Sequence, residues 1–263
     1  MKIAILGAAG YLGSYLCQYL ELHHTVIPVT RDTVDLTDYE AVDTWLSQTT
    51  PDVIVNCAVS GGGRRVDDIN YTDVQTDFGI FLNFYNNPAV RKYINIGSGG
   101  EFDRRTSITN AEERDILHAT PLETYSYTKN IIARTILRRN GFYTLRVFGC
   151  FDGSEPEIRL FKKFKATGKI TIQDKLFDYI SSEDFARIVL HYCESTDLFK
   201  DLNCVYKDKT TLLAALQIFA KHHVPDGQIE VTGKGLNYTG SGINLSRLAI
   251  PLAGLEQGIK HYG

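Results

Sequence analysis

A tyrosine and a lysine stand four residues apart in the segment Tyr125–Lys129, which reads Tyr-Ser-Tyr-Thr-Lys. The surrounding pattern predicts a helix, on which side chains at positions i and i+4 share one face. The positive charge of Lys129 would then favour the ionised form of the Tyr125 phenol. A phenol held in this way can give a proton to a carbonyl oxygen or take one from a hydroxyl. The chain contains 15 tyrosines, so this spacing needs support from its surroundings.

Ser98 supplies a hydroxyl earlier in the chain. It follows a predicted strand over Arg91–Ile96, and glycines stand on both sides of it. In open α/β sheets, ligands bind at the edge where the carboxyl ends of the strands lie. We therefore expect the Ser98 hydroxyl to hold a substrate oxygen beside Tyr125. The alternative interpretation is that Ser98, Tyr125 and Lys129 are unconnected polar residues.

A glycine-rich loop, Gly7–Gly13, lies between the first predicted strand and the first predicted helix. In a dinucleotide-binding loop, the first glycine permits a tight turn, the second lets the backbone approach a pyrophosphate, and the third lets helix and strand pack closely. The helix N-terminus then presents unpaired N–H groups to the phosphates. The residues expected to contact such a cofactor are Gly7, Gly10, Tyr11, Leu12 and Gly13. A nicotinamide on this cofactor would exchange a hydride with the substrate; the alternative is a glycine-rich turn without a ligand.

The end of the second predicted strand bears on which cofactor is used. An acidic residue there binds the ribose hydroxyls of NAD, whereas an arginine accommodates the 2′-phosphate of NADP. Arg31 comes first, followed by Asp32, and a guanidinium forms paired hydrogen bonds with phosphate. NADP(H) is therefore favoured, and NAD(H) remains possible. A solvated Arg31 without a ligand is the alternative.

These residues require a regular scaffold, which the first half of the chain predicts. Short apolar runs alternate with segments of helical spacing, a pattern that indicates βαβ units and a parallel sheet. The predicted strands are Lys2–Leu6, Thr25–Thr30, Asp52–Cys57, Arg91–Ile96 and Phe142–Val147. The predicted helices are Tyr11–Leu22, Asp38–Gln48 with Thr37 as its N-cap, Thr72–Asn86 and Leu122–Asn140. Right-handed crossovers make this a doubly wound α/β sheet of Rossmann type.

The pattern changes after Gly149. Residues 1–150 are interpreted as a dinucleotide-binding domain, which also receives part of 174–205. Residues 151–263 are interpreted as a small C-terminal substrate-binding cap without a core of its own. Its predicted helices are Ile158–Lys165, Ser182–Cys193 and Thr210–His222, and its predicted strands are Lys169–Ile172 and Leu202–Tyr206. The glycine-rich segment 227–242 is expected to be irregular.

Composition restricts the class of protein. The chain has 263 residues, of which 43% are hydrophobic and 22% charged, with a net charge of −3. Such values are typical of a folded globular protein, and they argue against nucleic acid as a partner. No apolar run approaches the ~18 residues that span a bilayer. The five cysteines show no zinc-binding spacing, so we expect no metal, no membrane partner, reduced thiols and a cytoplasmic location.

The order and spacing of these motifs over residues 1–190 resemble the extended short-chain dehydrogenase/reductases, the nucleotide-sugar epimerase/dehydratase family. The glycine loop, Asn56–Ala58, Ser98 and the Tyr125/Lys129 pair carry the resemblance. Residues 254–259 are similar to the family's C-terminal helix. Within the family, residues 30–38 and 51–58 are similar to those of GDP-fucose synthases and dTDP-4-dehydrorhamnose reductases.

The resemblance implies several roles. Arg31 would contact the 2′-phosphate of NADP, and Asp35 and Leu36 would contact the adenine. Cys57 and Ala58 would lie alongside the cofactor. Lys129 would also contact the nicotinamide ribose. The family further implies a homodimer through the helices near 72–86 and 122–140. Apolar positions on these helices suit either a dimer or burial against the sheet; they are Phe81, Phe84, Tyr85, Ile132, Ile136 and Leu137.

Departures from the family pattern narrow the reaction. The dehydratases carry an Asp-Glu pair after the serine, where this chain has Gly99 and Gly100. An arginine that often touches substrate phosphate is replaced by Phe177. The cations considered in its place are Arg159, Lys163, Arg64 and Arg65, any of which could instead be a solvated surface charge. The residues expected at the substrate are Gly99, Glu101 and Arg159, although Glu101 could merely cap a loop.

Three functions follow from the resemblance. The leading one is NADPH-dependent reduction of the C4 carbonyl of a nucleoside-diphosphate 4-keto-deoxysugar, with Ser98, Tyr125 and Lys129 as the catalytic residues. The second is C4 epimerisation of a nucleotide-sugar with retained NAD. The third is a cofactor-binding regulatory subunit without turnover.

Overall fold

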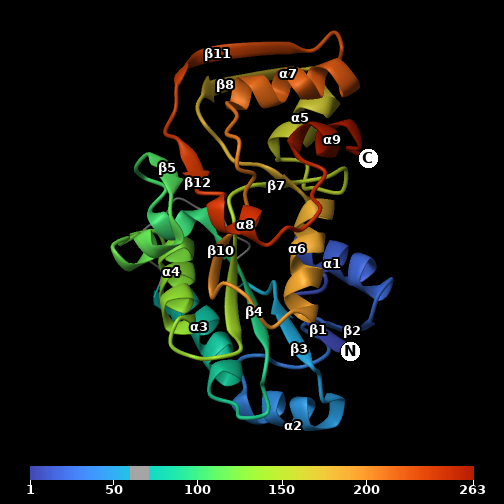
Figure 1. The fold of residues 1–263 in the computed structure, drawn as a ribbon, viewed down its shortest axis with the longest axis vertical. Helices are drawn as coiled ribbons and strands as arrows, with labels where there is room; N and C mark the ends of the chain where they lie inside the picture. Colours follow the sequence, from blue (N-terminus) through green and yellow to red (C-terminus); the bar gives the residue numbers. More distant parts are fainter. Residues whose placement is uncertain (60–70) are drawn as a thin grey trace.

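The apolar runs of the first half form a parallel sheet in the computed structural model, which describes residues 1–59 and 71–263 (Figure 1). Six strands lie in the order β10-β6-β4-β3-β1-β2, and every neighbouring pair is parallel. They are β1 (Lys2–Leu6), β2 (Thr25–Val29), β3 (Val53–Asn56), β4 (Tyr93–Ser98), β6 (Phe142–Val147) and β10 (Asp201–Asn203). The predicted doubly wound sheet is confirmed, and β10 from the second half of the chain joins its edge.

Alternation along the strands divides the hydrophobic core into two layers. Ile3 and Ile5 face one side with α1 (Tyr11–Glu21) and α6 (Ser182–Glu194). Ala4 faces the other side with three further helices, which are α2 (Tyr39–Thr49), α3 (Tyr71–Tyr85) and α4 (Thr124–Ile136). Figure 1 shows α1 beside α6 on one side of the sheet, with α3 and α4 on the other. A parallel sheet covered on both faces is the Rossmann-type arrangement.

The apolar positions considered for a dimer interface lie largely inside this second layer. Phe81 and Phe84 of α3 and Ile132 and Ile136 of α4 are buried against the sheet. Packing within the chain accounts for these residues, so they give no support to a dimer. The dimer stays a prediction of the family resemblance.

The remaining elements lie mostly above the carboxyl edge of the sheet. Three parallel strand pairs are β8 (Lys169–Asp174) with β11 (Gln228–Lys234), β5 (Ile108–Ala111) with β12 (Tyr238–Gly240), and β7 (Cys150–Phe151) with β9 (Ile180–Ser181). The helices are α5 (Leu160–Thr167), α7 (Leu212–His223), α8 (Ile243–Arg247) and α9 (Leu255–Lys260), with short 3-10 helices η1 (Gly99–Phe102) and η2 (Glu113–Leu117). The expectation that 227–242 is irregular is wrong, because β11 and β12 lie within it.

The expectation that residues after 150 lack a core is also wrong. A separate hydrophobic cluster is built only from residues 151–262. Aromatic rings dominate it: Phe161 stacks on Phe219 with centroids 4.8 Å apart, and Tyr262 meets Phe219 edge-on at 4.9 Å. These rings are buried, and buried aromatic pairs stabilise the fold by more than the burial of their surface area alone.

Several helix ends differ from the sequence prediction, most clearly those of α2 and α4. Asp38, rather than Thr37, caps α2, and its carboxylate accepts from the backbone N–H groups of Glu40 and Ala41. The Thr37 hydroxyl instead donates to Asp35 at 2.7 Å. The predicted helix 122–140 is shorter at both ends, since α4 covers Thr124–Ile136. Within residues 1–59 and 71–263, no helix has the length and apolar character needed to cross a membrane.

Candidate active site

The glycine loop has the geometry that its sequence predicts. Gly7 adopts φ +75°, and a Cβ there would lie 2.8 Å from the backbone nitrogen of Ala58. A Cβ at Gly13 would lie 2.2 Å from the carbonyl oxygen of Gly7. The two glycines therefore permit the turn after β1 and the close approach of α1 and of the loop after β3. Gly10 caps α1 without a side-chain hydrogen bond, so the N-terminus of α1 is left open for an anion.

A cavity of about 630 Å³ runs from this loop to the second half of the chain. The glycine loop contributes Gly10, Tyr11, Leu12 and Gly13 to its wall. β3 lies beside β1 on the side opposite β2, and at such a reversal of strand order a doubly wound sheet binds its ligand. A turn that only glycine can make, an open helix N-terminus and this cavity together fit the pyrophosphate of a dinucleotide cofactor.

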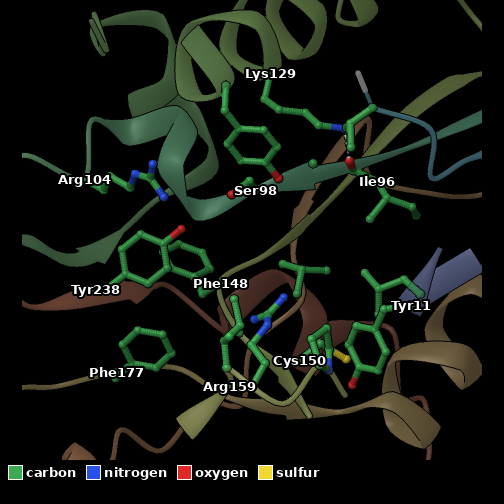
Figure 2. A pocket seen from close by; sticks show the side chains of 18 of the residues that line it. Tyr11, Ile96, Ser98, Arg104, Lys129, Phe148, Cys150, Arg159, Phe177 and Tyr238 are labelled. Carbon is green, nitrogen blue, oxygen red and sulfur yellow. Dashed lines mark hydrogen bonds between the residues drawn. The ribbon is translucent and has the colours of Figure 1, made fainter. Parts of the chain in front are cut away.

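The three predicted catalytic residues line this same cavity. Lys129 is buried, and its Nζ donates to the carbonyl oxygen of Ile96 at 2.8 Å (Figure 2). The Ser98 hydroxyl accepts from the backbone N–H of Gly100 at 3.2 Å, which leaves its own proton to donate. Tyr125 stands on the first turn of α4, four residues before Lys129. The fold therefore brings Ser98, Tyr125 and Lys129 together at the carboxyl edge of β4.

Glu101 does not line this cavity, and its expected contact with a sugar does not fit its surroundings. Its side chain is fully buried, accepting from the Ser98 backbone N–H at 2.8 Å and from Arg146 Nε at 2.7 Å. Burial raises the pKa of Glu101, and the Arg146 charge opposes this. Glu101 therefore caps η1 and holds the backbone of Ser98 in place, as the alternative interpretation proposed.

Only some of the residues predicted to lie along the cofactor line the cavity. Cys57 lines the cavity, and burial raises the pKa of its thiol to about 12, so the thiol stays protonated. Ala58 lies against Gly7. Arg31 is exposed in the turn after β2 and lies outside the cavity. Asp35 and Leu36 also lie outside it: Asp35 accepts from the Thr37 backbone N–H at 2.9 Å, and Leu36 O accepts from Asn83 at 2.8 Å.

The Tyr11 side chain has a structural partner that the sequence did not suggest. Its hydroxyl donates to Asp152 Oδ2 at 2.9 Å and lies 3.0 Å from Ser182 Oγ. Burial raises the pKa of Tyr11 well above its usual range. The side chain of Tyr11 thus joins α1 to the segment after β7 and to α6, and Tyr11 also lines the cavity.

Of the residues predicted to contact the substrate or its phosphates, some line the cavity and others do not. Arg159 lines the cavity with its guanidinium 5.9 Å from the Tyr11 ring centre. Lys163 is exposed and lies outside the cavity. Gly99 is buried, and the space a Cβ would need is filled by the Phe148 ring, 2.4 Å away. Arg64 and Arg65 lie outside the described residues.

Sequence reasoning missed two cations and an aromatic group at the far end of the cavity. Arg104 follows η1, and Lys175 follows β8; both line the cavity. So do the rings of Phe148, Phe177 and Tyr238. Figure 2 shows Arg104 and Tyr238 on the side opposite Tyr11, with Arg159 between the aromatic group and Tyr11. The Arg-Arg pair six residues after Ser98 was the available signal. Among the described residues, no cluster of His, Cys, Asp or Glu could hold a metal ion.

Comparison with known proteins defines the class. The model of the NAD dependent epimerase/dehydratase family matches residues 3–204, and the chain belongs to this family. It is thus an NAD(P)-dependent enzyme of the oxidoreductase class, as the resemblance predicted. Comparison with curated protein sequences gives no match.

Solved structures show the same fold at low sequence identity. A GDP-mannoheptose C4 reductase from Campylobacter jejuni, with NADP bound, has a TM-score of 0.80 at 16% identity, covering 99% of this chain and 96% of that one. A dTDP-4-dehydrorhamnose reductase from Clostridium acetobutylicum has a TM-score of 0.81 at 17% identity, covering 100% and 98%. A GDP-L-fucose synthetase from Naegleria fowleri has a TM-score of 0.80 at 14% identity, covering 99% and 92%. These likenesses confirm the fold over the whole chain.

Proposed function

We propose that this protein is an NADPH-dependent reductase of the C4 carbonyl of a nucleoside-diphosphate 4-keto-deoxysugar. The observation that carries the proposal is the joint position of Ser98, Tyr125 and Lys129 in the cavity that begins at the glycine loop. Gly99 and Gly100 stand where a dehydratase would carry acidic residues. The remaining groups suffice for reduction of a carbonyl. The similar solved structures named above include a C4 reductase.

Each catalytic side chain has one task in this proposal. A bound nicotinamide supplies the hydride. Tyr125 donates its phenol proton to the C4 oxygen, which becomes a hydroxyl. Ser98 orients that oxygen by donating its free O–H proton. Lys129, fixed by the Ile96 carbonyl, supplies a positive charge that offsets the negative charge developing on the Tyr125 oxygen.

The second half of the chain closes the site. We propose that residues 151–263 form the substrate-binding cap, except for α6 and β10, which pack on or join the main sheet. Arg159, Lys175 and Phe177 come from this part of the chain and line the cavity. Arg159, beside Tyr11, would contact an anionic part of the cofactor or substrate.

The proposal is tested by incubating the protein and NADPH with a panel of nucleotide-linked 4-keto sugars and following the loss of NADPH. We expect NADPH to be consumed with at least one member, with the 4-hydroxy sugar as product. Consumption with none of them would overturn the reductase proposal. An epimerase would instead be purified with NAD bound and would interconvert C4 epimers without net NADPH loss. A regulatory subunit would bind the cofactor and convert nothing.

The preference for NADPH rests on Arg31. Its guanidinium is exposed at the carboxyl end of β2, where an arginine accommodates a 2′-phosphate. Arg31→Ala should raise the Kd for NADPH about 10- to 100-fold, since hydrogen bonds to charged groups are among the stronger ones. The Kd for NADH should stay within about threefold. Equal effects on the two cofactors would contradict this role.

A further inference from the structure

The cavity carries an excess of positive charge. Its described lining includes Arg104, Lys129, Arg159 and Lys175 and no aspartate or glutamate. Lys129 is engaged by the Ile96 carbonyl, and Arg159 lies beside Tyr11 at the glycine loop. Arg104 and Lys175 are the two cations of this lining without an assigned task.

Arg104 is oriented by one carboxylate and keeps an unused donor. Its Nε donates to Glu123 Oε2, and Glu123 also accepts from Ser126 Oγ at 3.1 Å. Arg104 Nη2 is buried and has no hydrogen-bond partner within the described residues. A buried N–H without a partner is unfavourable, and a group of this kind at a cavity wall becomes satisfied when a ligand oxygen binds.

The backbone before Arg104 separates it from its neighbour. Asp103 adopts φ +70°, an uncommon conformation for a residue other than glycine. Its carboxylate accepts from the Nε and Nη2 of Arg105, at 2.8 Å and 2.6 Å. Arg105 is thereby paired at the surface, whereas Arg104 lines the cavity. The two adjacent arginines form a matched pair for an experiment.

Lys175 presents a second cation with little support from the protein. Its ammonium lies 5.5 Å from the centre of the Phe177 ring. Burial lowers the pKa of Lys175. No ion pair with a carboxylate is found for it among residues 1–59 and 71–263. A bound anion would replace the hydration that this half-buried ammonium has lost.

Asn237 connects the two segments that carry these cations. The N–H of Ile108, four residues after Arg104, donates to Asn237 O at 2.8 Å. The N–H of Leu176, next to Lys175, donates to Asn237 Oδ1 at 3.1 Å. Asn237 therefore ties the segment after Arg104 to the segment after Lys175. The adjoining wall is aromatic: the Phe148 and Phe177 rings lie 5.0 Å and 5.3 Å from Tyr238. Apolar walls strengthen the attraction between charges by excluding water.

We propose that Arg104 and Lys175 form an anion subsite that binds the diphosphate group of the substrate. The inference rests on the proposed function for the identity of the ligand, and on the cavity for its charge. Arg104 offers a planar donor whose direction is set by Glu123, and Lys175 offers a point charge. This subsite lies on the Phe148–Phe177–Tyr238 side of the cavity, opposite Tyr11 and the glycine loop (Figure 2).

Equilibrium binding tests the subsite without turnover. UDP, GDP, dTDP and inorganic pyrophosphate are titrated calorimetrically into the protein saturated with NADPH. We expect Arg104→Gln and Lys175→Gln each to raise the Kd of the tightest-binding of these ligands by about 10- to 100-fold. Arg105→Gln, the matched control, should leave its affinity within about twofold, and the Kd for NADPH should not change in any variant.

The outcomes separate the subsite from the proposed reaction. Unchanged diphosphate binding in both variants would overturn the subsite, as would the absence of binding by all four probes to the wild type. A loss confined to one variant would overturn the two-cation arrangement. If diphosphates bind through both cations but no 4-keto sugar is reduced, the proposed function fails and the subsite stands. Because Arg104→Gln leaves Glu123 without its cation, the double variant Arg104→Gln/Glu123→Gln is measured beside it and should show the same loss.

Discussion

Arg146 and Arg104 both lie near the carboxyl edge of the sheet, but they differ in how many of their nitrogens have hydrogen-bond partners. Arg146 lies on β6 and is fully buried. Each of its three guanidinium nitrogens donates a hydrogen bond: Nε to Glu101 at 2.7 Å, Nη1 to Asn203 at 2.9 Å and Nη2 to Asp201 at 2.8 Å. Arg104 has one engaged nitrogen and one buried nitrogen without a partner.

The difference shows how one type of side chain serves two purposes. A guanidinium with each of its three nitrogens engaged fixes the elements around it; here Arg146 holds Glu101, which in turn holds the Ser98 backbone. A guanidinium with a free donor at a cavity wall is arranged for a ligand. Satisfied and unsatisfied donors thus distinguish the structural arginine from the candidate binding arginine.

The largest effect is expected when the fully paired arginine is removed. Arg146→Met leaves the buried carboxylates of Glu101 and Asp201 without their cation. We expect a loss of about 3–5 kcal/mol in the free energy of unfolding, because an uncompensated buried charge is costly. Urea unfolding measures this, with the exposed Arg138→Met as control. A loss below about 1 kcal/mol would break the distinction between the two arginines.

A buried carboxyl that makes no ion pair within the described part of the chain gives a smaller, pH-dependent effect. Glu155 is buried, accepts from the Tyr262 hydroxyl at 2.8 Å, and has a pKa raised to about 7 mainly by burial. The folded protein then keeps this proton above the pKa of the unfolded chain, so the contribution to stability falls as the pH rises from about 4.5 to about 7. We expect Glu155→Gln to remove roughly 1–3 kcal/mol of this pH dependence.

Urea unfolding at several pH values across this range checks the prediction for Glu155. The wild type should lose more stability than the Glu155→Gln variant as the pH rises. Parallel pH profiles for the two proteins would show that Glu155 titrates normally.

The smallest effect is expected for the cavity pair. In Arg104→Gln/Glu123→Gln both charges are removed together. We expect the free energy of unfolding to change by less than about 1 kcal/mol, because removing both members of the pair leaves no uncompensated buried charge. Thermal and urea unfolding measure it, with Asp103→Asn/Arg105→Gln as the exposed control pair. A change as large as that of Arg146→Met would make Arg104 structural.

Local patterns predicted the main scaffold well. The strands Lys2–Leu6 and Phe142–Val147 have the bounds expected from their apolar runs. The glycines at Gly7 and Gly13 occupy the constrained positions that the loop pattern requires. The spacing of Tyr125 and Lys129 placed both on one helix that opens at the cavity. In each case the information lies within a few neighbouring residues.

Contacts between distant segments account for what the sequence did not predict. Glu101 is buried because Arg146, 45 residues later, pairs with it. The glycine content of 227–242 favoured an irregular segment, although Ile229 and Val231 alternate with polar residues there. The strand β11 forms because it pairs with β8, which lies far earlier in the chain. Arg104 stands between Asp103 and Arg105, in a charged run that looks solvated until the chain folds around it.

In the proposed reaction, Tyr125 protonates a carbonyl oxygen in this cavity. The most direct measurement is the turnover of Tyr125→Phe with NADPH and the 4-keto sugar that the wild type reduces, with the Kd for NADPH measured in parallel. We expect kcat to fall about 10²- to 10⁴-fold while the Kd for NADPH stays within about threefold. Near-normal turnover of Tyr125→Phe would contradict this role.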